Sequence, residues 1–324
     1  MSELFTLKVT SGGEPDTLEK ALSMLPPTGR ARILLSPGTW VEKVVITRPD
    51  TILEGAGPDK TVLTWDDCAT APYAPGETAG TFRTATLRVA ADRVTLRRLR
   101  VENAAWPRET CHQAIALYVN GDQFLCENCR LDGYQDTLFL SPLPPFEIEP
   151  NGFRGPDKDL PRRPQRHLFR RCSISGDIDF IFGGSAAFFD SCELISRDGR
   201  KDRHDPFVGF CAAPSTPKGQ EMGFVFYHCR FLSDRIPKGS VYLARPWRDD
   251  AKAAFIQCGL DEHINPLWFH DWDKPQARES AVFAVYQLWG PGILGEHCSF
   301  ARVLNAEEAE HYSLECFERF PLPE

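Results

Sequence analysis

Basic residues are not in excess in this sequence, and long apolar runs are absent. Lys and Arg total 37 against 45 Asp and Glu, which gives a net charge of −8 and a pI near 5.6. A phosphate backbone or an anionic lipid surface attracts a basic patch, so we expect neither nucleic acid nor a membrane as a partner. No stretch approaches the length of a membrane span, and residues 1–10 lack the basic and apolar segments of a signal peptide. These absences predict a cytoplasmic protein.

Motifs for nucleotides, serine nucleophiles and metals are also missing. The sequence contains no P-loop and no GxSxG, and its 8 His show no HxH or HExxH spacing. We therefore expect no cofactor and no metal. The composition, 42% hydrophobic and 25% charged, excludes a disordered or fibrous chain. Because the composition does not change along the chain, residues 1–324 are predicted to form one domain.

A pattern recurs in six segments, each with an anchor residue at the same place. The segments are TLRRLRV, LCENCRL, LFRRCSI, FFDSCEL, VFYHCRF and AFIQCGL. Their anchors are Leu99, Cys129, Cys172, Cys192, Cys229 and Cys258. Apolar residues stand two positions after and three positions before every anchor, whereas the position directly after the anchor is never apolar. This pattern predicts one recurring type of strand with an inner and an outer side.

A short strand that repeats at intervals of at least 20 residues cannot bury its apolar side alone, so the copies must stack on a shared core. The predicted fold class is all-β, a parallel β-helix wound from a single chain, with short terminal helices and long loops that form a groove. Stacking would give ladders of like residues about 4.8 Å apart. Cys126 and Cys129, which have the spacing of a CxxC ligand pair, are then core residues, since Leu or Phe occupies their columns in other turns.

Gly and Pro residues separate the remaining elements. Further strands are predicted at 31–35, 43–47, 50–55 and 60–65. Helices are predicted at 16–24 and 305–312, where they would cover the two open ends of the stack. Residues 142–166 and 197–221 are predicted to be long loops, and long loops on a rigid stack tend to shape a binding groove.

The repeat places two carboxylates in one column. Asp136 and Asp179 each stand seven residues after an anchor, so in neighbouring turns they would lie on the order of 5 Å apart. Two carboxylates that close cannot both ionise freely, so one should keep a proton. Gly133, Gly176 and Asn103 stand four residues after their anchors, and all three residue types tolerate positive φ in a tight corner.

Other polar residues near this column are further candidates. Asp179 lies among apolar neighbours and needs a partner, for which Arg245 is the candidate. Asp177 is interpreted as a rim or turn residue. Gln113 and Gln135 are 22 residues apart, close to the shortest interval of the repeat, so their amides could donate toward one point, as an oxyanion requires.

Four blocks carry a family resemblance. HQAIAL at 112–117, DGYQDTLF at 132–139, GDIDFIFG at 176–183 and YLARPW at 242–247 resemble the signature blocks of the pectin methylesterases, and PGTWVEKVVI at 37–46 resembles the first block of that family. The resemblance implies a right-handed parallel β-helix. It also implies hydrolysis of the methyl ester of galacturonate units, which releases methanol without a cofactor.

The resemblance implies a role for each candidate. Asp179 would attack the ester carbonyl and form an acyl-enzyme anhydride, while Gln113 and Gln135 would bind the oxyanion. Asp136 would protonate the departing methanol and then activate the water that clears the intermediate. Arg245 would orient Asp179 and keep it ionised.

Aromatic residues are candidates for contact with sugar rings. By the resemblance, Trp247 and Phe182 would stack on the substrate. Tyr134, Trp106 and Trp289 are further candidates for the groove.

The sequence also departs from the family pattern. Ala244 stands where the fourth block usually has Gly, and YQLWGPGIL replaces a more acidic stretch near the C-terminus. A cytoplasmic monomer would not meet polymeric pectin, so short methylated oligogalacturonides taken up by a bacterium are the expected substrate.

Three alternatives stay open at this point. The same scaffold could carry a polysaccharide glycosidase with paired carboxylates, a diverged acyl or thioester hydrolase, or a carbohydrate-binding protein without activity. Release of methanol without new reducing ends would distinguish the esterase from the glycosidase.

Overall fold

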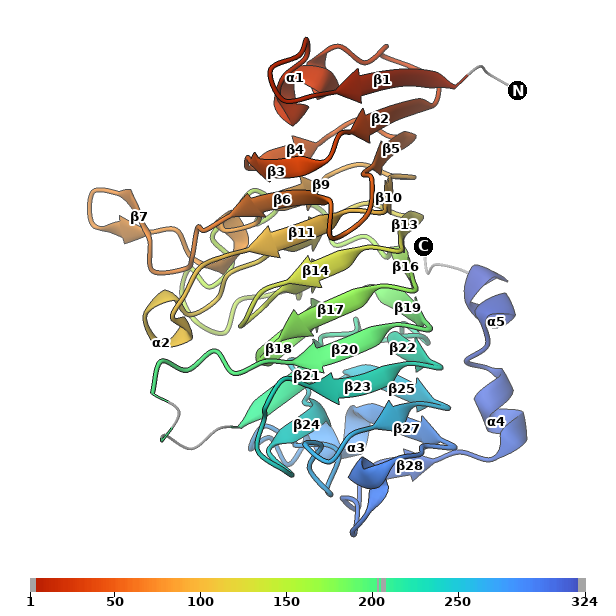
Figure 1. The fold of residues 1–324 in the computed structure, drawn as a ribbon. Helices are drawn as coiled ribbons and strands as arrows, with labels where there is room; N and C mark the ends of the chain where they lie inside the picture. Colours follow the sequence, from red (N-terminus) through yellow and green to blue (C-terminus); the bar gives the residue numbers. More distant parts are fainter. Residues whose placement is uncertain (1–3, 203, 205–207, 320–324) are drawn as a thin grey trace.

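The computed structural model describes residues 4–202, 204 and 208–319. It is a stack of parallel strands that follow one another in chain order along a single axis (Figure 1). The strands form three long sheets, here named sheets A, B and C, and each central turn of the chain contributes one strand to each sheet. The β-helix predicted from the repeat is confirmed.

The three sheets have these members in chain order. Sheet A contains β1 (Phe5–Val9), β2 (Ala31–Leu35), β5 (Thr51–Glu54), β10 (Thr95–Arg97), β13 (Phe124–Glu127), β16 (Arg166–Arg170), β19 (Ala186–Asp190), β22 (Phe224–Tyr227), β25 (Lys252–Ile256), β27 (Val282–Tyr286) and β28 (Ala301–Val303). Sheet B contains β3 (Gly38–Val41), β6 (Thr61–Trp65), β11 (Arg100–Asn103), β14 (Arg130–Asp132), β17 (Ser173–Gly176), β20 (Glu193–Ser196), β23 (Arg230–Ser233) and β26 (Gly259–Leu260). Sheet C contains β4 (Val44–Ile46), β9 (Leu87–Val89), β12 (Leu117–Val119), β15 (Leu138–Leu140), β18 (Ile178–Gly183), β21 (Gly209–Pro214) and β24 (Val241–Ala244).

The predicted columns are confirmed residue by residue. In sheet A the residues three before the anchors pair across successive strands, in the order Leu96, Cys126, Phe169, Phe189, Phe226 and Phe255. In sheet B the residues two after the anchors pair in the same way, in the order Val101, Leu131, Ile174, Leu194, Phe231 and Leu260. All of them are buried. The core is therefore the interior of the stack, filled by these ladders and by the anchors.

Each segment that the repeat predicted as one strand is two strands joined at a corner. The residue directly before each anchor has φ between 49° and 54°, which turns the chain from sheet A into sheet B. These corner residues are Arg98, Asn128, Arg171, Ser191, His228 and Gln257. The single-strand interpretation was wrong. Inward-facing residues of one strand are two positions apart, whereas the inward-facing residue before each anchor is three positions from it. The extra residue forms the corner.

The expected positive φ at Gly133, Gly176 and Asn103 was also wrong, since none of the three has it. Gly176 is required for space instead: a Cβ there would lie 2.2 Å from the Cβ of Phe180. The side chain of Asn103 donates from Nδ2 to the carbonyl oxygens of Asp67 and Thr84, at 2.9 and 3.2 Å. These positions therefore serve close packing and not a left-handed turn.

Helices lie at the start of the stack and along one side. α1 (Leu18–Ser23) begins after Thr17, whose side chain accepts the N–H of Lys20, and it packs against β1 and β4 as predicted. α4 (Ala306–Glu310) is confirmed within 305–312 and has a capping box between Asn305 and Glu308. The other short helices are α2 (Arg108–Cys111), α3 (Ala277–Ser280), α5 (Leu314–Arg319), η1 (Thr81–Arg83) and η2 (Pro291–Ile293).

The sequence predicted that a C-terminal helix would cover the open end of the stack. This prediction was wrong, because the C-terminal helices lie elsewhere. α4 and α5 run along the outer face of sheet A (Figure 1). Phe317 packs on Phe188, with ring centroids 5.3 Å apart. The reason is that sheet A has an outer apolar surface of its own, formed by residues such as Phe188, Val225 and Ala254, and this surface needs a cover.

The long loops are only partly as predicted. Residues 142–165 contain no strand, in agreement with the prediction. The segment 197–221 contains β21, which pairs with β18 and β24 and so extends sheet C. A small antiparallel hairpin, β7 (Pro72–Ala74) with β8 (Glu77–Thr78), projects from the stack (Figure 1). No helix among the described residues is long and apolar enough to cross a membrane.

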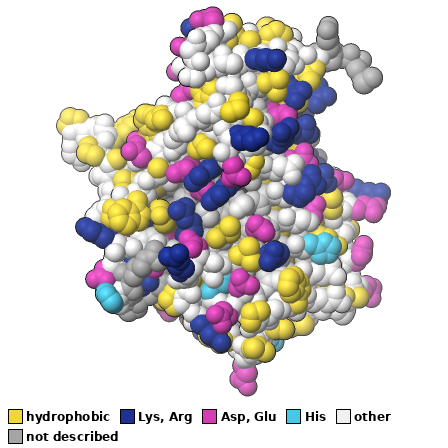
Figure 2. Space-filling view, viewed as in Figure 1, with side chains coloured by type: hydrophobic (Ala, Val, Ile, Leu, Met, Phe, Trp, Pro, Cys, Tyr) yellow, Lys and Arg dark blue, Asp and Glu magenta, His cyan; other side chains and the backbone are white. Residues whose placement is uncertain are grey.

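Basic and acidic side chains are interspersed on the face over sheet B (Figure 2). Asp132 of β14, for example, lies 2.7 Å from Arg100 on the neighbouring strand β11 and 2.7 Å from Arg130 on its own strand. Charges that neutralise one another in this way leave no uniform basic surface on this face.

Candidate active site

A cavity of about 560 Å³ opens beside sheet C. It brings together all five residues predicted to be catalytic, namely Gln113, Gln135, Asp136, Asp179 and Arg245. Residues 148–153 of the long loop contribute one wall, as expected for a groove shaped by loops on a rigid stack.

Asp136 and Asp179 are neighbours in register. Leu131 pairs with Ile174 before them and Leu138 pairs with Ile181 after them, so the offset is 43 residues on both sides and the same offset joins the two aspartates. The backbone N–H of Asp136 donates to the carbonyl of Ile178 at 3.0 Å, which fixes the two turns to each other. Both aspartates have positive φ, 67° and 47°, which aims their side chains away from the regular pleat.

The two carboxylates have different electrostatic environments. Burial raises the pKa of Asp136 well above its usual range, the negative charge of Asp179 raises it further, and Arg245 only partly opposes this. Asp179 accepts two hydrogen bonds from Arg245, at 2.8 Å from Nε and 2.6 Å from Nη2. The site therefore offers a neutral carboxylic acid beside a carboxylate with a bidentate counter-charge.

The guanidinium of Arg245 lies between two aromatic rings. Its central carbon is 3.9 Å from the ring centre of Phe210 and 3.7 Å from that of Trp272. Such cation–π contacts fix the plane of the guanidinium and so the direction of its hydrogen bonds to Asp179. Neither Phe210 nor Trp272 was predicted from the sequence, because Phe210 lies on β21, in a segment predicted to be a loop, and Trp272 lies in a loop after β26.

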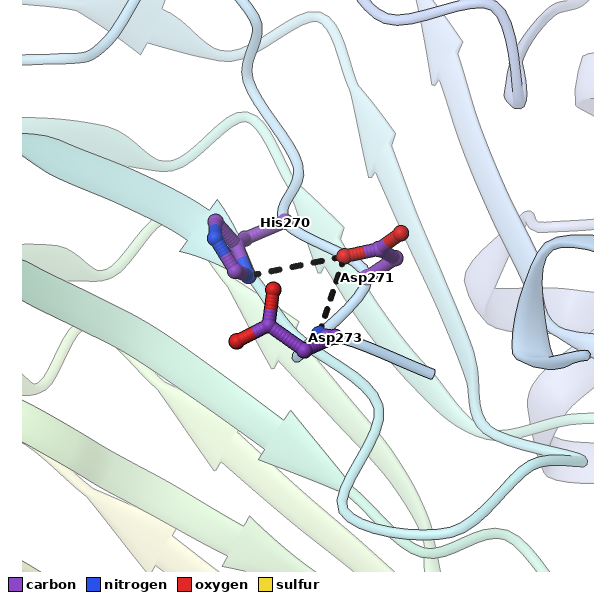
Figure 3. A group of neighbouring side chains, drawn as sticks. All are labelled: His270, Asp271 and Asp273. Atoms are coloured by element: carbon purple, nitrogen blue, oxygen red, sulfur yellow. Dashed lines mark hydrogen bonds and ion pairs between the residues drawn. The ribbon is translucent and has the colours of Figure 1, made fainter. Parts of the chain in front are cut away.

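Trp272 lies in a loop next to His270, Asp271 and Asp273, whose side chains lie close together (Figure 3). The backbone N–H of Trp272 donates to Nδ1 of His270 at 2.9 Å, and the backbone N–H of Asp273 donates to Oδ1 of Asp271 at 3.0 Å. His270, Asp271 and Asp273 have potential ligand atoms within 4.8 Å of one another, but Asp271 also accepts from Arg278 at 2.7 Å. With Nδ1 of His270 and both Asp271 oxygens engaged, this group acts as a support for Trp272.

The two glutamines lie on neighbouring turns with their amides at the cavity. The N–H of Ala114, next to Gln113, donates to the backbone carbonyl of Gln135 at 3.0 Å, so the ladder joins the two positions directly. Within the described part of the chain, neither side-chain amide makes a hydrogen bond. Both amides are therefore available as donors to a bound group.

Trp247 and Phe182 both line the cavity but differ in exposure. Trp247 is half-buried and meets the ring of Phe182 edge-on, with centroids 5.6 Å apart. Phe182 is only 3% exposed and packs against Phe139 at 4.9 Å. Trp247 can present a ring surface to a ligand, whereas Phe182 mainly forms the wall behind it.

Three aromatic candidates do not line the cavity. The ring of Tyr134 is covered by the guanidinium of Arg197 at 4.5 Å. Trp106 is 50% exposed in the segment before α2, and Trp289 is 54% exposed where it packs on Gly259 of sheet B. The structure therefore does not place these three residues with the catalytic candidates.

Asp177 lies at a bend between β17 and β18, as expected for a turn residue, but it is fully buried, so its interpretation as a rim residue was wrong. It lies 2.9 Å from Nε of Arg108, and burial raises its pKa to about 7. This ion pair could not be predicted from the sequence, because Arg108 lies on α2, in a stretch between two turns that has no fixed register with Asp177.

A parallel β-helix with an acidic pair, two free amides and an oriented arginine in one cavity defines a class of hydrolases that act through carboxylates. The family model for pectinesterase matches residues 7–144 and 152–318, and the chain therefore belongs to the pectinesterase family.

Known relatives agree with this assignment. The chain is 26% identical over 310 residues to pectinesterase QRT1 of Arabidopsis thaliana, covering 93% of this chain and 73% of that protein. It is 28% identical over 287 residues to pectinesterase 2 of Citrus sinensis, covering 86% of this chain and 50% of that protein. The chain thus spans about half the length of some of the plant relatives it matches.

Solved structures share the fold. Pectin methylesterase PemA from Erwinia chrysanthemi superposes with a TM-score of 0.80 at 24% identity, covering 99% of this chain and 100% of the other. Pectin methylesterase from Yersinia enterocolitica gives 0.76 at 26% identity, covering 92% and 97%. The winding of the β-helix is right-handed, as the resemblance had implied.

Proposed function

We propose that this chain hydrolyses the methyl ester of galacturonate units, in pectin or in methylated oligogalacturonides, and releases methanol. Membership of the pectinesterase family supports the reaction class. The observation that carries the proposal is the pairing of a buried Asp136, kept neutral by its surroundings, with Asp179, oriented by two hydrogen bonds from Arg245.

The first half of the reaction uses the two aspartates in different protonation states. A carboxylate oxygen of Asp179 attacks the ester carbonyl, and the amides of Gln113 and Gln135 donate to the oxyanion that forms. The tetrahedral intermediate collapses as the bond to the methoxy group breaks, and Asp136 gives its proton to that oxygen. Methanol leaves, and the sugar acyl group remains on Asp179 as an anhydride.

The second half regenerates the enzyme. Asp136, now ionised, accepts a proton from a water molecule, which attacks the acyl carbon of the anhydride. The bond to Asp179 breaks, and the galacturonate leaves with a free carboxylate. Ester and water are thereby converted to acid and methanol, and both aspartates return to their starting protonation states. Trp247, half-exposed at the cavity, would contact a sugar ring of the substrate.

The test is methanol release from methylated oligogalacturonides by the wild type and by Asp179→Asn and Asp136→Asn. We expect both variants to lose at least about a thousandfold in kcat, because each removes a group that reacts directly. Asp190→Asn is the matched control, since Asp190 lies at a corner of sheet A and is expected to keep full activity.

Other outcomes would contradict the proposal in distinct ways. New reducing ends without methanol would indicate a glycosidase, and turnover of acyl thioesters alone would indicate a thioester hydrolase. Binding of the oligosaccharide without any product would indicate a binding protein. The cytoplasmic location, the monomeric state and the preference for short substrates stay predictions, and cell fractionation, light scattering and a chain-length series would test them.

A further inference from the structure

A buried ion pair lies next to the site and has no part in the reaction as described. It consists of Asp177, which has no exposed surface, and Arg108, whose Nε lies 2.9 Å from Oδ2 of the aspartate. The other oxygen of Asp177 accepts the backbone N–H of Ile178 at 2.7 Å. Neither Nε of Arg108 nor Oδ2 of Asp177 has a hydrogen-bond partner among the described residues, so the contact between them is electrostatic.

The pair joins the two segments that carry opposite sides of the reaction. Arg108 begins α2, its carbonyl accepts the N–H of His112 at 2.7 Å, and Gln113 follows directly. Asp177 immediately precedes β18, two residues before Asp179. The ion pair therefore connects the segment of an oxyanion donor to the strand of the attacking carboxylate.

The surroundings leave just enough space for the pair. A Cβ at Gly199 would lie 2.4 Å from Oδ2 of Asp177 and 3.2 Å from the Cβ of Arg108, so this position must lack a side chain. The carbonyl of Gly199 also accepts the backbone N–H of Arg108 at 3.2 Å. A third segment thus encloses the pair, and the position of Arg108 is determined by its backbone as well as its side chain.

The pair also contributes charge to the site. The groups that act on Asp177 are Arg108 from α2, Asp198 from the segment after β20, and, across the cavity wall, Asp136. The groups that act on Asp136 are Asp179, Arg245 and Asp177. When Asp177 is ionised, its negative charge adds to that of Asp179 and favours the neutral form of Asp136.

We propose that Arg108 and Asp177 are a positioning pair for the reaction, which sets the distance between the amide of Gln113 and the carboxylate of Asp179. This inference rests on the proposed function. Neither residue touches the reacting atoms, and the pair acts through the groups that do.

The experiment compares Arg108→Leu, Asp177→Asn and the double variant in methanol release. We expect kcat to fall about 10- to 100-fold, as for a displaced catalytic group, with KM changed less than about threefold. The double variant should be no worse than either single variant, because the two residues act as a unit. It also avoids a buried unpaired charge, so it remains testable if a single variant does not fold.

Further measurements separate positioning from plain stabilisation. Arg166→Leu with Asp122→Asn removes an ion pair of 2.8 Å elsewhere in the stack and should lower stability without changing kcat. Arg108→Lys should recover part of the lost kcat. In Asp177→Asn the pKa of Asp136 should fall, so the alkaline limb of the kcat profile, where Asp136 loses its proton, should move to lower pH.

Carbon-13 NMR of labelled aspartate reads the titration of Asp136 without turnover. A wild type that releases no methanol would remove the proposed function, and the NMR shift between wild type and Asp177→Asn would still decide whether Asp177 acts on Asp136. A double variant that is folded, with wild-type kcat and an unchanged titration of Asp136, would overturn the positioning pair.

Discussion

Arg245 differs from an ordinary ion-pair partner in how completely its side chain is constrained. Two hydrogen bonds fix its edge to Asp179, and the rings of Phe210 and Trp272 both contact its guanidinium. A lysine in this place would keep the charge but lose the planar fork and most of the ring contact. The orientation of Asp179 thus depends on the shape of the guanidinium as well as on its charge.

We therefore expect Arg245→Lys to lower kcat/KM by about 100-fold, since a nucleophile that is wrongly oriented reacts slowly. Methanol release measured over a range of substrate concentrations tests this. Arg278→Lys is the control, because Arg278 is an exposed partner of Asp271 and should retain its activity. Equal activity of the two variants would show that charge alone is sufficient at position 245.

The raised pKa of Asp136 has opposite effects on activity and on stability. In the folded protein Asp136 keeps its proton at a pH where the unfolded chain has already lost it, so the unfolded state is favoured as the pH rises above the ordinary value of 3.8. The stability that this proton confers is complete below that value and is lost as pH rises through the folded pKa. Activity should decline over the upper part of the same range, because the acid form is needed.

Asp136→Asn should therefore be inactive yet more stable than the wild type at pH 8, with a smaller difference at pH 4. Urea unfolding at the two pH values, followed by circular dichroism, measures this. A variant that is less stable than the wild type at pH 8 would indicate that Asp136 is ionised in the folded protein.

Among the elements, the stacked phenylalanines of sheet A form the most regular part of the core. The rings of Phe169, Phe189, Phe226 and Phe255 follow one another with centroids 4.7 to 4.8 Å apart and planes within 15°. This spacing is that of the strands themselves, so the rings take their arrangement directly from the parallel register.

Removing one ring from the middle of the stack should leave a cavity that both neighbours adjoin. We expect Phe226→Ala to lower the free energy of unfolding by about 3–5 kcal/mol. Phe5→Ala, at an exposed position of β1, should cost much less. Denaturant unfolding of both variants measures the difference, and similar losses would mean that the stacked rings contribute no more than an exposed ring.

The sequence predicted these elements well wherever their spacing from an anchor is constant. Leu96 and Val101 stand at fixed distances from Leu99, and their counterparts pair in every turn that the repeat identified. The corner at Arg98 was missed, although the three-residue step from Leu96 to Leu99 marks it, because one left-handed residue interrupts an alternating pattern by a single position.

The site could be predicted to the same extent and for the same reason. Asp136 and Asp179 have fixed distances from their anchors, and Arg245 lies in a recognisable block, so the structure brings all three together. Phe210 could not be predicted, because its strand, β21, lies in a segment that the sequence predicted to be a loop. Trp272 could not be predicted, because nothing in the local sequence shows where a loop brings its side chains. Trp289 was predicted to lie at the groove but does not line the cavity, and its position could not be predicted for the same reason.

For the molecule as a whole, the C-terminal helices act as a side cover. Phe317 of α5 lies on Phe188, on the outer face of sheet A, whereas the cavity lies beside sheet C. The cover and the site are thus on different faces of the stack, and a change in one should not reach the other.

We expect Phe317→Asp to release α5, expose the apolar surface around Phe188 and increase the binding of a hydrophobic dye such as ANS, with kcat within about twofold of the wild type. Glu318→Gln on the same helix is the control, since its side chain is largely exposed. A large loss of kcat in Phe317→Asp would show that the two faces are coupled.

The order of strands in sheet A has a consequence for how the molecule opens. The turns that carry Asp136 and Asp179 begin with β13 and β16, the fifth and sixth of eleven strands, so several turns lie on either side. In a stack where each turn contacts only its neighbours, loosening starts at the outermost turns and proceeds inward. Amide hydrogens near the two aspartates should therefore exchange last, and brief fraying at either terminus would leave turnover intact.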